Sequence, residues 1–138
     1  MFARSFGVVA GLLLATSAAG AENLDALNLH PVEANMVKYT NAQRAKHGLA
    51  PLVVDARLLQ SARGHAAWMT NAHTLRHTTA PVAENIAMGQ TTSYEAVQDW
   101  MNSSGHRANM LGRGYTRIGA AAYTARNGRR FWCLQFLR

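Results

Sequence analysis

The feature of this sequence that most constrains its fold is a pair of apolar runs near the C-terminus, residues 115–124 and 130–137, separated by Asn127-Gly128. An Asn-Gly pair between two such runs is a strong β-hairpin signal, because both central positions of its turn favour positive φ. The segments before this hairpin carry helical rather than alternating apolar spacing. The sequence therefore predicts an α+β domain, with helices followed by a terminal hairpin.

Two helices are expected in the first half of the chain. The first begins at Pro31, which suits a first helical position, and ends at His47-Gly48, where the glycine can adopt the left-handed conformation. Asp55 is a natural N-cap for the second helix, which should end at residues 71–73. The apolar face of that helix consists of Leu58, Leu59, Ala62, Ala66 and Met69.

A third helix is predicted after residue 92. Thr92 and Glu95 fit a capping box, in which the threonine caps the helix and the glutamate lies three residues later. This helix is expected to bury Tyr94, Val97 and Met101, with Trp100 beside them. Ser103 or Ser104 can cap the short helical turn that follows.

Size and composition indicate one folded domain. The chain has 138 residues, of which 49% are hydrophobic and 15% charged, and this balance argues against disorder. Fourteen Lys and Arg residues against seven Asp and Glu favour anionic partners, unless the basic side chains are simply solvated. The basic residues are dispersed, so we expect no dedicated nucleic-acid surface. We also expect the protein to be a monomer.

The N-terminus has the composition of a targeting segment. Arg4 precedes an apolar run over residues 6–15, and Ala19-Gly20-Ala21 offers small residues for a signal peptidase. We expect a signal peptide over residues 1–21, a mature domain over residues 22–138 and no transmembrane segment after cleavage; the alternative is an uncleaved anchor. The single cysteine, Cys133, lies in an apolar run and is expected to be a buried, inert thiol.

Three segments together resemble the CAP superfamily, which includes cysteine-rich secretory proteins, antigen 5 and pathogenesis-related proteins of class one. They are residues 41–52 (NAQRAKHGLAPL), 77–89 (HTTAPVAENIAMG) and 100–111 (WMNSSGHRANML). The sequences of these segments are most similar to those of small secreted bacterial members, and the resemblance covers about residues 32–136. It implies an α-β-α sandwich in a single domain. Asn41 and Arg44 are expected to tie the end of the first helix to neighbouring backbone.

The resemblance also implies a surface cleft with two histidines and two acidic residues. Carried over by motif, His77 and His106 match the histidines and Glu84 matches the first glutamate. Ser103 occupies the place of the second glutamate, so the set is incomplete. Glu95 or Asp99 can substitute only if its side chain faces the cleft.

Such a cleft allows three kinds of role. Neutral His77 and His106, with Glu84 as a ligand or second-shell partner, can bind a divalent cation such as Zn²⁺. Alternatively, Glu84 can assist His106 as a general base in a hydrolase, or these groups can form a structural hydrogen-bond network. A serine-protease role for Ser103 is disfavoured because the sequence lacks a Gly-x-Ser-x-Gly elbow.

The functional prediction is a secreted or periplasmic CAP-domain protein that acts by binding. Its cleft would hold a metal ion or an unidentified small ligand, and its basic surface would contact an anionic envelope or host component. A peptidase-like or esterase-like hydrolase and a lipid-binding protein are the two alternatives. The resemblance does not fix the ligand or partner.

Overall fold

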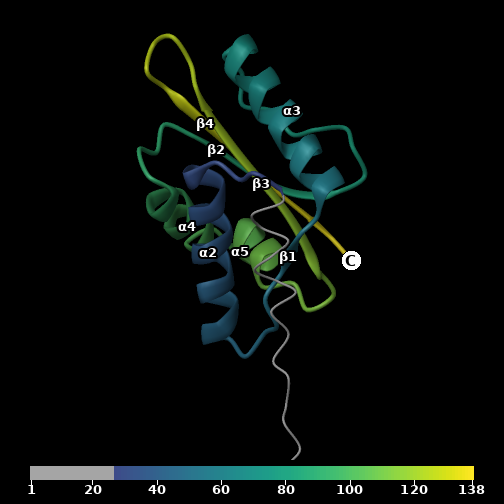
Figure 1. Ribbon diagram of the computed structural model, residues 1–138. Coiled ribbons are helices and arrows are strands. Elements are labelled where there is room, and N and C mark those ends of the chain that lie inside the picture. The colour runs from purple at the N-terminus through teal and green to yellow at the C-terminus, as the bar shows by residue number, and fades with distance from the viewer. Residues whose placement is uncertain (1–26) are drawn as a thin grey trace, which may run out of the picture.

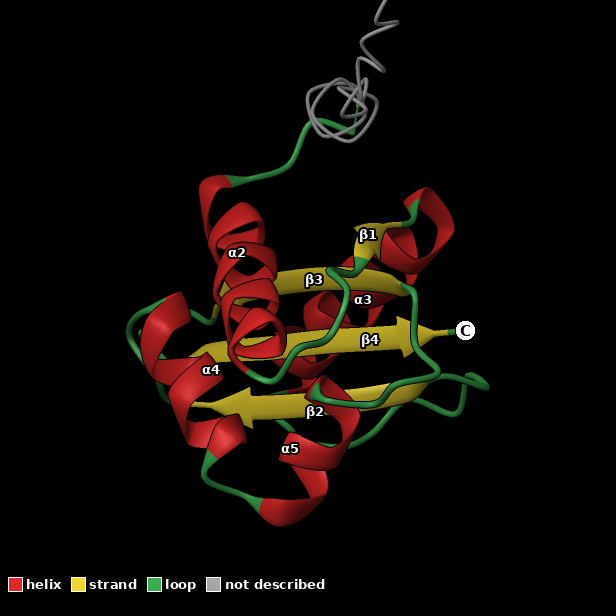
Figure 2. Ribbon diagram, turned by 90° about the horizontal axis from the view of Figure 1, so that it is seen from below, coloured by secondary structure: helices red, strands yellow, loops and turns green. Residues whose placement is uncertain are grey.

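The computed structural model describes residues 27–138, and the signal peptide predicted over residues 1–21 lies outside them (Figure 1). The elements are α2 (Pro31–Lys46), β1 (Val53–Val54), α3 (Ala56–Ala72), β2 (Ala83–Met88), α4 (Ser93–Met101), α5 (Ser104–Met110), β3 (Arg117–Thr124) and β4 (Arg130–Leu137). The strands form one sheet in the order β1-β3-β4-β2, with β1 parallel to β3 and the other pairs antiparallel. Helix α3 covers one face, and α2, α4 and α5 cover the other (Figure 2). The fold is therefore the α-β-α sandwich expected from the sequence.

The boundaries of the first two helices agree with the sequence prediction. Helix α2 begins at Pro31, and Gly48 follows its end with a φ of 69°. The Asp55 side chain accepts a hydrogen bond of 2.9 Å from the backbone N–H of Leu58 and so caps α3. Helix α3 ends at Ala72, and the following residue, His73, adopts the left-handed conformation.

The cap of α4 is confirmed, as is the burial of Val97, Trp100 and Met101, but the burial of Tyr94 was predicted wrongly. The Thr92 hydroxyl accepts a hydrogen bond from the Glu95 N–H, as a capping residue should. Tyr94, expected in the core, is 57% exposed and packs edge-on against Tyr39. The buried face starts one residue earlier, at Ser93, whose hydroxyl donates to the backbone of α2, and it comprises Ser93, Ala96, Val97, Trp100 and Met101. Since successive helical residues are rotated by about 100°, Tyr94 is turned toward the surface.

The terminal hairpin is confirmed, with a different turn. Strands β3 and β4 pair up to Thr124 and Arg130, but only Gly128 in the connection has a positive φ, of 84°. The predicted two-residue turn requires positive φ at Asn127 as well. The connection is longer: the Ala125 N–H donates to the carbonyl of Arg129, and Gly128 alone takes the left-handed position.

The sheet separates two apolar cores, and the side chains of β4 alternate between them. Trp132, Leu134 and Phe136 pack with α2, α4 and α5, whereas Phe131 and Cys133 pack with α3. Cys133 is fully buried, as predicted, and burial raises the pKa of its thiol well above the ordinary value. The thiol is therefore protonated and unreactive at neutral pH.

Helix α3 approaches β3 so closely that one strand position has no room for a side chain. A Cβ atom added to Gly119 would overlap the carbonyl group of Leu58 and lie 2.8 Å from the amide nitrogen of Leu59. Glycine at this position lets the first turn of the helix rest directly on the strand backbone.

The predicted anchoring roles of Asn41 and Arg44 are confirmed. The Asn41 side chain donates to the carbonyl of Leu52 and accepts from the N–H of the same residue. The buried Arg44 guanidinium donates to three backbone carbonyls, those of Ala50, Met110 and Gly112. These bonds connect the end of α2 to the end of α5.

Within residues 27–138, no helix is both long and apolar enough to cross a membrane.

Candidate functional site

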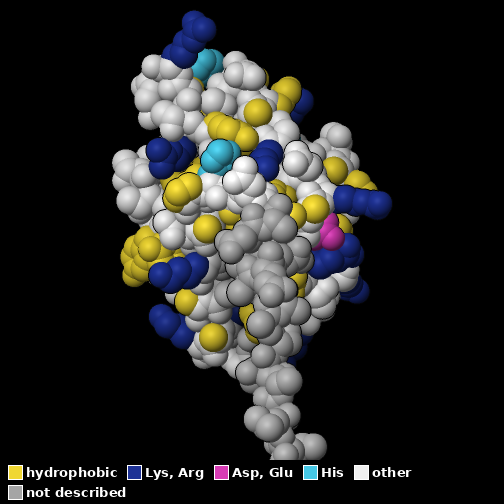
Figure 3. Space-filling model, viewed as in Figure 1, with side chains coloured by type: hydrophobic (Ala, Val, Ile, Leu, Met, Phe, Trp, Pro, Cys, Tyr) yellow, Lys and Arg dark blue, Asp and Glu magenta, His cyan; other side chains and the backbone are white. Residues whose placement is uncertain are grey.

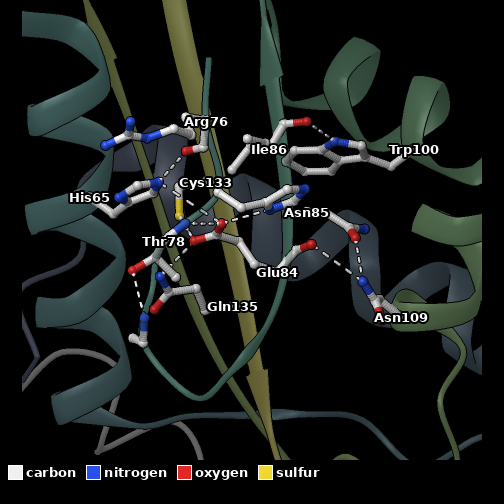
Figure 4. A network of polar contacts seen from close by, with 12 residues as sticks. His65, Arg76, Thr78, Glu84, Asn85, Ile86, Trp100, Asn109, Cys133 and Gln135 are labelled. Atoms are coloured by element: carbon white, nitrogen blue, oxygen red, sulfur yellow. Dashed lines mark hydrogen bonds and ion pairs between the residues drawn. The ribbon is translucent and has the colours of Figure 1, made fainter. Parts of the chain in front are cut away.

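The site is built around Glu84, which points from β2 toward α3 (Figure 4). Its Oε1 accepts hydrogen bonds of 2.9 Å from the His77 Nδ1 and from the backbone N–H of Thr78. Its Oε2 accepts a bond of 2.9 Å from the Gln135 Nε2 and a longer one from the Cys133 thiol. Both carboxylate oxygens are therefore already engaged by the protein.

This network keeps Glu84 charged. Burial by itself raises the pKa of a carboxyl group, but the hydrogen bonds from Gln135, Thr78 and His77 outweigh it and hold the pKa of Glu84 below its ordinary value. A charged Glu84 requires His77 to donate through Nδ1, which fixes the tautomer of a neutral ring. The His77 side chain is 59% exposed, so the opposite ring nitrogen, Nε2, is left for a ligand.

The residue after Glu84 fixes α5 from the other face of β2. The Asn85 amide donates to the carbonyl oxygen of His106, and its Oδ1 accepts from the Asn109 side chain. Asn109 also donates to the carbonyl of Glu84. The backbone of the helix that carries His106 is thus tied directly to the strand that carries Glu84.

His106 itself is half-buried on α5. Burial lowers the pKa of its imidazole, and the charge of nearby His77 lowers it further. The two histidines, 29 positions apart in the sequence, therefore lie within electrostatic reach of each other. The lowered pKa favours the neutral form of His106, which is the form that binds metal ions.

Ser103 and the two alternative acidic residues do not complete the set. Ser103 is half-buried at the N-cap position of α5, but its hydroxyl makes no capping hydrogen bond. Glu95 is exposed and accepts from Thr91, and Asp99 is exposed and accepts from Gln90. Both carboxylates instead bond the connection between β2 and α4, so neither replaces the second glutamate.

Gln135 and His65 were not predicted from the sequence to be partners of Glu84. Gln135 lies opposite Glu84 in the β2–β4 ladder and is fully buried. A polar residue inside an apolar strand was the available signal for it. His65 was expected to be packed and not a ligand; its Nε2 donates to the carbonyl of Arg76 and lies 3.9 Å from the Glu84 Oε1.

The donor set limits how a metal could be held. Across the described part of the chain, no group of three or more His, Cys, Asp or Glu side chains is arranged to hold a metal ion. Because Glu84 is saturated, the side chains with ligand chemistry that remain here are His77 and His106. Glu84 hydrogen-bonds the ring of His77, and His106 lies within electrostatic reach of that ring.

Comparison with known proteins agrees with this architecture. The family model described as "Cysteine-rich secretory protein family", CAP, matches residues 37–136. YkwD of Bacillus subtilis (strain 168) is 34% identical over 122 residues, covering 76% of this chain and 46% of that protein. The chain spans less than half the length of the first curated relatives it matches.

Solved structures show the same fold. An extracellular protein containing an SCP domain from Bacillus anthracis str. Ames is 25% identical, with a TM-score of 0.69 over 80% of this chain and 44% of that one. The structure titled "NaASP2 with Zn2+" is 12% identical, with a TM-score of 0.62 over 76% of this chain and 78% of that one. Because the family model covers most of the chain and the fold agrees, this protein belongs to the CAP, or cysteine-rich secretory protein, family.

Proposed function

We propose that this protein is a secreted CAP-domain binding protein whose His77 and His106 hold a divalent cation such as Zn²⁺. The observation that carries the proposal is the 2.9 Å hydrogen bond from the His77 Nδ1 to the Glu84 Oε1. Histidines that bind metals usually donate their other ring N–H to such a partner, which fixes the ring and makes the free nitrogen more basic. The carboxylate that would orient His77 is therefore already in hydrogen-bond contact with it.

His106 supplies the second imidazole in this proposal. Its lowered pKa keeps the ring neutral at pH 7, and the bond from Asn85 to its carbonyl oxygen fixes its backbone. Zinc sites that act on or bind small molecules keep open positions for water or ligand. With two protein ligands, the site would bind the cation weakly and leave positions for an added ligand.

Secretion and the basic surface belong to the same proposal. The Bacillus anthracis relative is described as extracellular, and the present chain carries a formal net charge of +7. Lys and Arg side chains are spread over the face shown in Figure 3, where acidic side chains are scarce. This distribution favours weak contact with anionic envelope or host surfaces rather than one concentrated site.

The hydrolase alternative receives no support from the geometry. That alternative required Glu84 to assist His106 as a general base, but the carboxylate hydrogen-bonds His77 instead. We therefore propose binding and not catalysis.

Calorimetric titration of the purified, metal-free protein with Zn²⁺ tests the proposal. His77→Ala and His106→Ala should each abolish or strongly weaken the binding heat, and Glu84→Gln should weaken affinity by about 10-fold or more. The matched control is His30→Ala, because His30 is exposed and contacts Glu33 through its backbone N–H, which alanine retains. If His77→Ala binds Zn²⁺ as the natural protein does, the proposed site is wrong.

A further inference from the structure

A hollow lined in part by His77 lies between α3 and the segment that follows it. We call it the Trp68 pocket; its volume is about 230 Å³, and it is lined by His65, Trp68, Arg76, His77, Thr78 and Thr79. A water molecule occupies about 30 Å³ of liquid, so the pocket has room for a small organic molecule. It is smaller than the roughly 300–1,000 Å³ typical of drug-sized ligands.

The pocket exposes the ring of Trp68, which lies outside both apolar cores. Trp68 is 40% exposed, whereas Trp100 and Trp132 are 1% and 0% exposed. Its indole has two close neighbours: the His65 ring lies nearly parallel with its centroid at 5.7 Å, and the Arg76 guanidinium carbon lies 4.9 Å from the indole centroid. These contacts fix the orientation of the ring and leave part of it open as an apolar surface.

Arg76 brings an unused positive charge to this surface. Among residues 27–138, the structure records no hydrogen bond or ion pair for its guanidinium, although its backbone carbonyl accepts from His65. The N–H groups of a guanidinium lie in its own plane, where two of them can match the two oxygens of a carboxylate.

The remaining lining favours an anion over a cation. None of the six lining residues is acidic, and the hydroxyls of Thr78 and Thr79 add hydrogen-bonding groups. Glu84 contacts two of the lining residues, His77 and Thr78, but its side chain is 3% exposed and both its oxygens are hydrogen-bonded. The Glu84 carboxylate is therefore buried, and its charge is stabilised by hydrogen bonds from the protein.

We propose that the Trp68 pocket binds a small organic carboxylate. The carboxylate would pair with Arg76, and a short apolar body would pack on the exposed part of the Trp68 indole. His77 lines this pocket and also belongs to the proposed cation site, but the carboxylate contacts proposed here, with Arg76 and Trp68, require no metal ion.

Fluorescence of protein that has been stripped of metal and then dialysed into chelator-free buffer tests the proposal. Two of the three tryptophans are buried, so saturable changes on titration with phenylacetate should come from Trp68 and disappear in Trp68→Phe. Neutral 2-phenylethanol and inorganic phosphate should bind at least about tenfold more weakly, because each lacks one half of the required ligand. That factor corresponds to about 1.4 kcal/mol.

The charge contact is tested by Arg76→Gln, measured by calorimetry as well as fluorescence. It should weaken phenylacetate binding about tenfold or more, as expected for loss of a hydrogen bond to a charged group. Arg113→Gln removes another exposed arginine, outside the pocket, and should bind as the natural protein does. No saturable response to phenylacetate, equal binding of 2-phenylethanol or phosphate, or unchanged affinity in Arg76→Gln would overturn the assignment, whatever the outcome of the Zn²⁺ titration.

Discussion

Replacing Gly119 and Gly64 by alanine, one at a time, should change the free energy of unfolding in opposite directions. Gly64 lies inside α3, and a Cβ atom added there meets nothing within 4 Å. The same atom added to Gly119 overlaps the carbonyl of Leu58 and the start of Leu59. The two substitutions are chemically identical and probe the same helix, once along its own backbone and once where it rests on β3.

The expected magnitudes follow from these surroundings. Gly119→Ala forces the first turn of α3 away from the strand, and overpacking of this kind costs about 1–3 kcal/mol or more. The obstructing atoms belong to the backbone and cannot rotate away, so we expect a loss near 3 kcal/mol, lessened by up to about 1 kcal/mol because alanine restricts the unfolded chain. Gly64→Ala should stabilise the protein by about 0.5–1 kcal/mol, the helix-propensity difference between these residues.

Urea unfolding followed by circular dichroism measures both effects on one scale. Gly119→Ala should lower the midpoint and Gly64→Ala should raise it, with little change in the slope. A free energy of unfolding for Gly119→Ala within about 0.5 kcal/mol of the natural protein would show that α3 does not rest on Gly119. In that case the packing of the α3 layer described here would be incorrect.

Two further predictions concern Arg44 and Asp55. Arg44→Met should destabilise the protein by about 3 kcal/mol, because it leaves three backbone carbonyls without their charged donor, whereas exposed Arg113→Met should change the urea midpoint little. The hydrogen bond from the Leu58 N–H is the main reason that the pKa of Asp55 lies below its ordinary value of 3.8. The charge of Asp55 therefore contributes stability above about pH 3.8, and this contribution is lost as pH falls through the lower pKa of the folded state. The stability difference between the natural protein and Asp55→Asn, measured by urea unfolding from pH 7 to pH 2.5, should narrow at the acid end; a constant difference would contradict this.

Local signals in the sequence were enough to place most helix ends and the terminal hairpin. Asp55 and Thr92 cap their helices because a short side chain at this position can accept a hydrogen bond from a free backbone N–H of the first turn. The burial of Tyr94 was predicted wrongly, since an aromatic residue within a short helix does not reveal which rotation the neighbouring helix selects. Strand β1, with only two residues, left no periodic pattern to detect, and its pairing with β3 depends on contacts distant in sequence.

The candidate site depended on a different kind of information. His77, Glu84 and His106 were grouped through the resemblance to the CAP family, and the structure pairs His77 with Glu84 and places His106 within electrostatic reach. Spacing along the chain could not show that Glu84 would be saturated, because Gln135 lies 51 residues away. The metal and ligand roles of these residues remain predictions for the titrations above.

The opposite orientations of Glu84 and Asn85 on edge strand β2 have a consequence for how the sheet assembles. A shift of β2 by one residue against β4 would exchange the two side chains between the faces. The carboxylate would then confront the carbonyl oxygen of His106, and the amide would meet the donors that now satisfy a negative charge. Two consecutive polar residues, each matched to partners on its own side, thus penalise every odd-numbered misalignment of a strand that has a neighbour along only one edge.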